Sequence, residues 1–114
     1  MKQRLKAPAH LKEPTRAWWR NVVRDWALEE HHVRLLTLAG EAYDRATEAQ
    51  TIIARDGLVI SGREGGARPH PAVAIRRDAE TAFSRLVREL DLDAEAPSAG
   101  RTGPPSLRSN RGGF

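Results

Sequence analysis

The chain has 114 residues, a formal net charge of +4 and a sequence pI near 10.3. It contains no cysteine, which excludes disulfides, iron–sulfur clusters and thiol catalysis. No apolar run approaches the roughly 20 residues of a membrane span, and no apolar stretch follows the basic N-terminus, so we expect one intracellular, non-membrane domain.

The positive charge is concentrated at the N-terminal end. Residues 1–28 hold seven Lys and Arg against two acidic residues, whereas residues 29–56 hold three Arg against six acidic residues. This asymmetry favours a protein that meets an anion with one end and protein partners with another. Because residues 1–12 lack apolar periodicity, we expect a basic flexible arm there, followed by a helical core domain over residues 13–93.

A first helix is predicted over about residues 14–27. Pro14 suits the start of a helix, and the apolar residues follow at spacings of three and four. At that spacing the three Trp side chains indicate a core or a subunit interface. The apolar face comprises Trp18, Trp19, Val22, Val23 and Trp26.

A second helix is predicted over residues 29–56. Glu29 and Glu30 would lie in its first turn, where the helix dipole favours negative charge, and Gly57 would end it. A helix of that length spans roughly 40 Å, so we expect it to pack on neighbouring chains.

Three further segments complete the chain. The run LVIS (58–61), the glycines of GREGGA and the RPHP stretch predict a short β-hairpin or extended loop. Pro71 then begins a third helix over about residues 71–91. Residues 94–114 are rich in Pro, Gly and Ser, so we expect a disordered C-terminal tail.

No motif for cofactor, metal or catalytic chemistry stands out. The stretch GREGGAR lacks the Lys-Ser/Thr end of a phosphate-binding loop, so we expect its glycines to turn the chain. His31 and His32 point about 100° apart on a helix, which is poor for chelation, and a role at the surface or at a helix start is favoured. The serines lack an oxyanion loop and no carboxylates are paired, so we expect no enzyme.

Basic residues of the arm and of the first helix are the predicted nucleic-acid contacts. They would bind phosphates without reading sequence, and a solvated helix face is the alternative for each one. The set comprises Lys2, Arg4, Lys6, Lys12, Arg16, Arg20 and Arg24. A secondary set comprises Arg63, Arg68, Arg76 and Arg77.

Subunit contacts are expected on the apolar seam of the second helix and on part of the third. These residues recur at helical spacing on helices too long for the small core. The predicted interface comprises Leu35, Leu38, Tyr43, Ile52, Ile53, Phe83 and Leu86.

The order of several segments resembles the small terminase subunit of tailed bacteriophages, in its short, mainly helical family. The matching segments are APAHL (7–11), RAWWRNVV (16–23), LEEHHVRLLTLAGEAYDRA (28–46), DGL (56–58) and RPHPAVAIRRDAETAFSRLVRELDLD (68–93). Where many relatives have Gly near the end of the last segment, this chain has Asp91.

The resemblance implies a mainly α fold that assembles into an oligomeric ring. It also implies binding to double-stranded viral DNA, and recruitment and regulation of the large terminase subunit, in the host cytoplasm during phage assembly. It implies no cofactor and no catalysis by this chain. A helical protein–protein adaptor without a DNA role is the main alternative. A cellular DNA-binding regulator ranks lower because no compact helix-turn-helix is evident.

Overall fold

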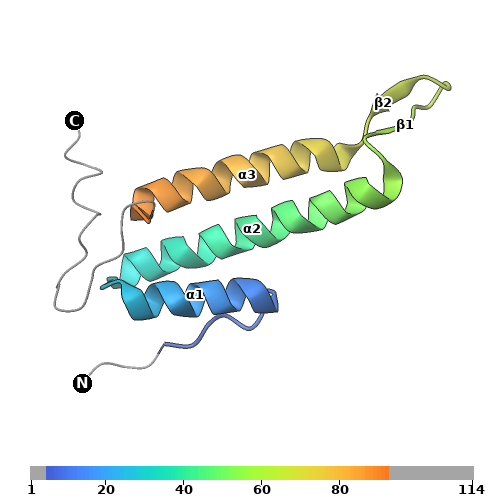
Figure 1. The fold of residues 1–114 in the computed structure, drawn as a ribbon. Helices are drawn as coiled ribbons and strands as arrows, with labels where there is room; N and C mark the ends of the chain where they lie inside the picture. The colour runs from blue at the N-terminus through green and yellow to red at the C-terminus, as the bar shows by residue number, and fades with distance from the viewer. Residues whose placement is uncertain (1–4, 93–114) are drawn as a thin grey trace, which may run out of the picture.

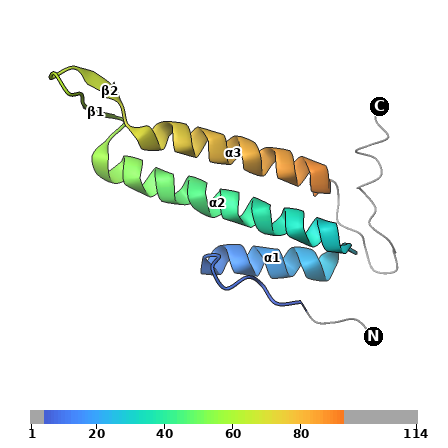
Figure 2. The same ribbon diagram turned by 180° about the vertical axis from the view of Figure 1, so that it is seen from behind.

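The structure is a computed structural model that describes residues 5–92. Three helices, α1 (Glu13–Asp25), α2 (Glu30–Asp56) and α3 (Pro71–Leu90), account for most of it. α2 lies between α1 and α3 and runs antiparallel to both (Figure 1). The strands β1 (Val59–Ser61) and β2 (Ala67–Pro69) form a hairpin beyond the C-terminal end of α2 and the N-terminal end of α3 (Figure 2). The predicted mainly α fold with a small hairpin between the second and third helices is confirmed.

The start of α1 is held by a side chain of α2. Lys12 occupies the N-cap position without a side-chain cap of its own. The Asp44 carboxylate instead accepts hydrogen bonds from the Lys12 backbone N–H at 2.8 Å and from the Thr15 hydroxyl at 2.5 Å. This contact satisfies one of the unpaired N–H groups of the first turn and ties α1 to the middle of α2.

The start of α2 is closed by a capping box. The Glu29 side chain accepts from the backbone of His32, and His32 Nδ1 accepts from the Glu29 N–H at 3.0 Å. The role at a helix start that the sequence favoured for this histidine is therefore confirmed. α2 ends at Gly57, whose φ of 91° is a conformation that side chains rarely adopt.

The glycine-rich stretch turns the chain, as predicted. Ile60 pairs with Arg68 in the antiparallel hairpin, and Gly65 adopts a φ of 85° in the turn. A side chain on Gly62 would place its Cβ 2.6 Å from the Gly66 carbonyl oxygen. Glycine at these two positions therefore allows the tight turn between the strands.

α3 begins and ends with specific caps. His70 is the N-cap residue, and its Nδ1 accepts a hydrogen bond from the Ala72 N–H at 3.0 Å. The helix ends at Asp91, which adopts the left-handed conformation with a φ of 58°. Asp tolerates this conformation better than most residues but less well than Gly.

The core divides into two clusters. The larger one joins α1 to the N-terminal half of α2 and the C-terminal end of α3; its buried members are Leu11, Trp19, Val22, Leu36 and Leu90. The smaller one, near the hairpin, consists of Ala49, Ile53 and Ala72. Leu11 lies within residues 1–12, for which the sequence predicts a flexible arm, yet it is only 2% exposed. The end of that segment therefore packs against the helices.

Candidate nucleic-acid interface

Each arginine of the predicted α1 stripe has a partner within its own chain. The Arg16 guanidinium donates to the carbonyl oxygens of Leu11 at 2.8 Å and Ala9 at 3.2 Å, and it pairs with Glu13. Arg20 Nη2 lies 3.5 Å from a Glu13 carboxylate oxygen. The role of Arg16 is therefore largely structural, because it holds the segment before α1 against the helix.

The remaining stripe residue, Arg24, pairs with its neighbour Asp25 at 2.8 Å. This hydrogen bond raises the pKa of Arg24 and lowers the pKa of Asp25. The hydrogen bond and charge of Arg16 likewise lower the pKa of Glu13. Two carboxylates thus offset part of the positive charge that the sequence assigned to DNA.

The lysines ahead of α1 are exposed. Lys12 Nζ lies 4.0 Å from a Glu48 oxygen, a weak exposed pair, and Lys6 extends from the segment before it. Lys2 and Arg4 lie outside the described residues. Four of the predicted contacts therefore have exposed side chains in the described part of the chain: Lys6, Lys12, Arg20 and Arg24.

The secondary set splits into two pairs. Arg63 and Arg68 lie exposed on the hairpin, and neither side chain has a hydrogen bond or ion pair within residues 5–92. Arg76 pairs with Glu80 at 2.9 Å, and Arg77 approaches Asp78 at 3.5 Å. The guanidinium groups of this hairpin pair therefore have no carboxylate partner, although Glu64 follows Arg63 in the turn and leaves the hairpin with a net charge of about +1.

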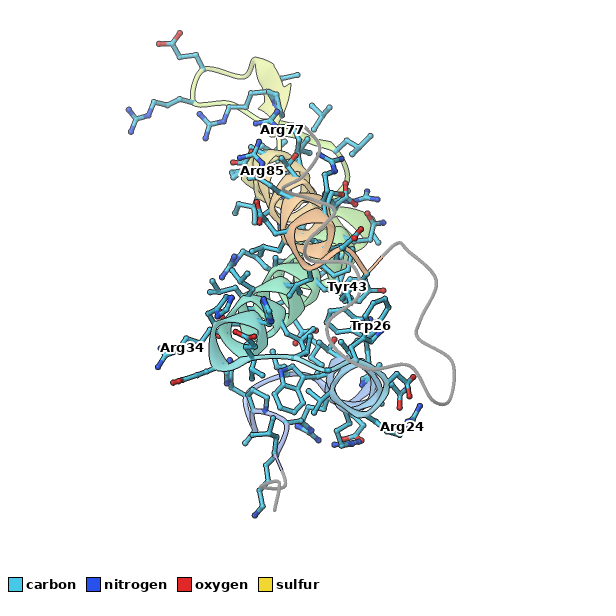
Figure 3. The ribbon with its side chains drawn as sticks, turned by 90° about the vertical axis from the view of Figure 1, so that its left-hand side faces the viewer. Arg24, Trp26, Arg34, Tyr43, Arg77 and Arg85 are labelled. Carbon is cyan, nitrogen blue, oxygen red and sulfur yellow. The ribbon has the colours of Figure 1, made fainter. Side chains whose placement is uncertain are left out.

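The sequence did not single out the basic residues farther along α3. Arg85 and Arg88 join Arg77 around a shallow hollow of about 300 Å³, which Glu80, Thr81 and Ser84 also line. Arg77 and Arg85 project at the edge of the molecule beside α3, whereas Arg24 lies at the opposite edge, below α1 (Figure 3). The helical spacing of these residues could have identified the cluster, but interleaved acidic residues made the polar face look evenly mixed.

The predicted subunit interface is spread over different surfaces. Tyr43 is 50% exposed and Leu38 is 51% exposed. Tyr43 packs against Phe83 with ring centroids 5.4 Å apart, and together they line a groove of about 530 Å³ between α2 and α3. Trp18 also packs against Phe83, with ring centroids 5.8 Å apart.

The other predicted interface residues are less accessible. Leu35, Ile52 and Leu86 are partly buried. Ile53 is only 7% exposed and belongs to the smaller core cluster, so it packs within its own subunit. The sequence period identified the apolar seam of α2 but could not separate the residues that face α3 from those that remain exposed.

The histidines contact carboxylates or backbone groups. His10 Nε2 lies 2.8 Å from Glu41, and His31 lies 3.9 Å from Glu29. Among residues 5–92, no group of three or more His, Cys, Asp or Glu side chains gathers as metal ligands would. None of the helices in this part of the chain combines the length and apolar character of a bilayer crossing.

The sequence profile of the family described as "phage terminase, small subunit" matches residues 15–103, more than three quarters of the chain. This chain belongs to the phage terminase small subunit family. The matched region of this small terminase subunit begins in α1 and runs through the hairpin and α3. Comparisons with curated proteins and with solved structures give no significant match.

Proposed function

We propose that this terminase small subunit forms a ring that binds double-stranded viral DNA and recruits and regulates the large terminase subunit. The observation that carries the proposal is the family match, which covers most of α1 and all of α2, the hairpin and α3. The chain would have no catalytic activity of its own and would act in the host cytoplasm during packaging. Catalysis would then belong to the large subunit.

DNA contact by the N-terminal basic residues is part of this proposal. The exposed side chains of Lys6, Lys12, Arg20 and Arg24 support it. Such side chains bind phosphates, displace counterions and give an affinity that falls steeply with salt. Lys2 and Arg4 belong to the same predicted set but lie outside the described residues.

Ring assembly is supported by apolar side chains on two different sides of α2. Leu38 and Tyr43 are five residues apart, so they point about 140° away from each other around the helix. A subunit with two different adhesive surfaces suits a head-to-tail contact, which is the type that closes into rings. A ring would also gather several weak DNA contacts around one duplex and raise its affinity through multivalency.

Three measurements test the proposal. Native mass spectrometry at micromolar concentration should give a mass several times 12.7 kDa, and a monomer alone would contradict the ring. Fluorescence anisotropy with a labelled duplex should show binding, and the logarithm of the association constant should fall linearly with the logarithm of the salt concentration. No salt-dependent binding would leave the protein–protein adaptor as the better explanation. Recruitment predicts that the purified large subunit co-migrates with the assembled chain in size-exclusion chromatography.

A further inference from the structure

We propose that the outer face of α3 and the β-hairpin form a second surface for the DNA backbone, separate from the N-terminal one. The α3 outer face is defined here by Arg77, Thr81, Ser84, Arg85 and Arg88. The proposal rests on the DNA binding proposed above, and it assigns residues to a contact that neither the family match nor the N-terminal charge identifies.

The charge balance on this side differs from that of the α1 stripe. The side chains of Arg63, Arg68 and Arg85 have no hydrogen bond or ion pair within the described part of the chain. Arg16, Arg20 and Arg24 each have a carboxylate partner. An arginine side chain without a partner in the protein loses no contact when it binds a phosphate. The side chains of Arg63, Arg68 and Arg85 are therefore better placed to bind DNA than those of the α1 stripe.

The α3 outer face has the shape and spacing of a phosphate-binding strip. Its members recur at three- and four-residue steps over one side of the helix and extend about 16 Å along its axis. The hollow that they surround has a volume of about 300 Å³. The hydroxyl groups of Thr81 and Ser84 line it, and such groups donate hydrogen bonds to phosphate oxygens. Glu80 at its rim is already paired with Arg76 at 2.9 Å, which offsets its charge.

The hairpin extends this surface beyond the N-terminal end of α3. It leaves the helical layer on the side where Arg77 projects (Figure 3). Both strands are short and exposed, apart from the partly buried Ile60. A two-stranded ribbon has dimensions that the major groove of DNA admits, so Arg63 and Arg68 can approach the duplex while α3 follows the backbone.

The two basic surfaces lie on opposite sides of the subunit. Arg24 and Arg85 mark the two edges of the helical layer in Figure 3. One stretch of duplex therefore meets only one of these surfaces on any given subunit. In an assembly, one duplex can meet the α3 surface of one subunit and the N-terminal surface of another at the same time, so the two contributions to its affinity should multiply.

The test uses the full chain and double charge reversals of equal size. Arg77→Glu with Arg85→Glu should weaken binding to a labelled duplex by more than tenfold and lower the salt slope by about two. The matched control, Arg34→Glu with Arg55→Glu, makes the same charge change on exposed residues near the two ends of α2 that belong to neither surface, and it should stay within about threefold of wild type. Circular dichroism and native mass must match wild type for all variants.

The outcomes separate this inference from the proposed function. If both double variants weaken binding equally, the effect is one of net charge and the α3 surface is rejected. If wild type binds DNA but the α3 variant binds as well as wild type, the inference is rejected and the proposed function stands. Adding Arg20→Glu and Arg24→Glu to the α3 variant should give a loss equal to the product of the separate losses. A wild-type chain that binds no duplex overturns both proposals.

Discussion

The Nε2 atom of His70 lies 3.0 Å from Oδ2 of Asp56, and this contact joins the last residue of α2 to the N-cap residue of α3. The other ring nitrogen of His70 accepts the Ala72 N–H. One imidazole therefore caps α3 and closes the base of the hairpin. Since Nδ1 accepts, the tautomer that serves both contacts carries its proton on Nε2.

Replacing His70 tests the capping role directly. His70→Ala should lower the free energy of unfolding by about 1 kcal/mol, the usual cost of losing an N-cap side chain. His70→Asn is the matched control, because an Asn side chain can still cap the helix although it is less suited to reach Asp56. Urea unfolding gives both values. Equal stability of the Ala variant and wild type would show that the cap contributes nothing.

The stability of the fold should depend on the charge of Asp56 in acid. The hydrogen bond from Arg55, followed by that from His70, holds the pKa of Asp56 well below its ordinary value of 3.8. A carboxyl whose folded pKa is lowered stabilises the fold fully above its unfolded pKa, and this stabilisation is lost as the pH falls below it. Wild type should therefore lose stability more steeply than Asp56→Asn between about pH 4 and pH 2. Parallel pH profiles of the two proteins would contradict this assignment.

Arg16 and Arg20 should separate structure from DNA binding. Arg16→Ala removes donors from two backbone carbonyls and should cost about 1–2 kcal/mol of stability. Arg20→Ala removes only a long, exposed contact to Glu13 and should change stability by less than about 0.5 kcal/mol. Thermal unfolding measures both effects. A stable Arg16→Ala variant that binds DNA poorly would restore Arg16 as a phosphate contact.

Gly40 lies where α2 packs tightly against Leu11, which precedes α1, and Thr15 within α1. A Cβ at this position would lie 3.1 Å from Leu11 Cδ1 and 3.1 Å from Thr15 Cγ2. Gly40→Val should therefore overpack the contact and cost about 1–3 kcal/mol. Gly66→Ala is the control, because no atom lies within 4 Å of its added Cβ and its φ is not positive. A Gly40→Val variant as stable as wild type would show that Leu11 and Thr15 can move away at little cost.

Leu38 tests the proposed subunit contact without disturbing the core. The side chain is 51% exposed, so Leu38→Glu should leave the subunit folded while placing a charge in an apolar interface. Native mass spectrometry should then show smaller assemblies or monomers. Leu58→Glu, at another leucine with 62% exposure, is the matched control and should assemble normally. Unchanged assembly of the Leu38 variant would remove this face of α2 from the interface.

The helices and their ends could be predicted because their determinants are local. The period of apolar residues, Pro14 and Pro71 near two helix starts, and Gly57 at a helix end depend only on nearby backbone geometry. The glycine-rich turn followed for the same reason. The order of these segments also carried the family resemblance, which the match over residues 15–103 confirms.

The candidate site could be predicted only in part, because neutralisation of a charge depends on contacts in space. The number of basic residues near the N-terminus does not reveal that the Arg16 guanidinium donates to two backbone carbonyl groups. It also gives no sign of Asp44, which lies 32 residues after Lys12 in the chain yet accepts the Lys12 N–H at the start of α1. Burial of Leu11 against Gly40 is likewise a property of how the helices cross.

The sequence by itself determined the helix boundaries to within two residues, the turn and the family, since each follows from the chemistry and order of neighbouring residues. Only the tertiary structure decided which cations are paired and which apolar side chains remain exposed. Ile53 and Leu38 belong to the same apolar seam of α2, yet one packs beneath α3 and the other faces outward. Arg20 and Arg85 look alike in the sequence, but only Arg20 has a carboxylate within reach among the described residues, because pairing depends on distances that the fold sets.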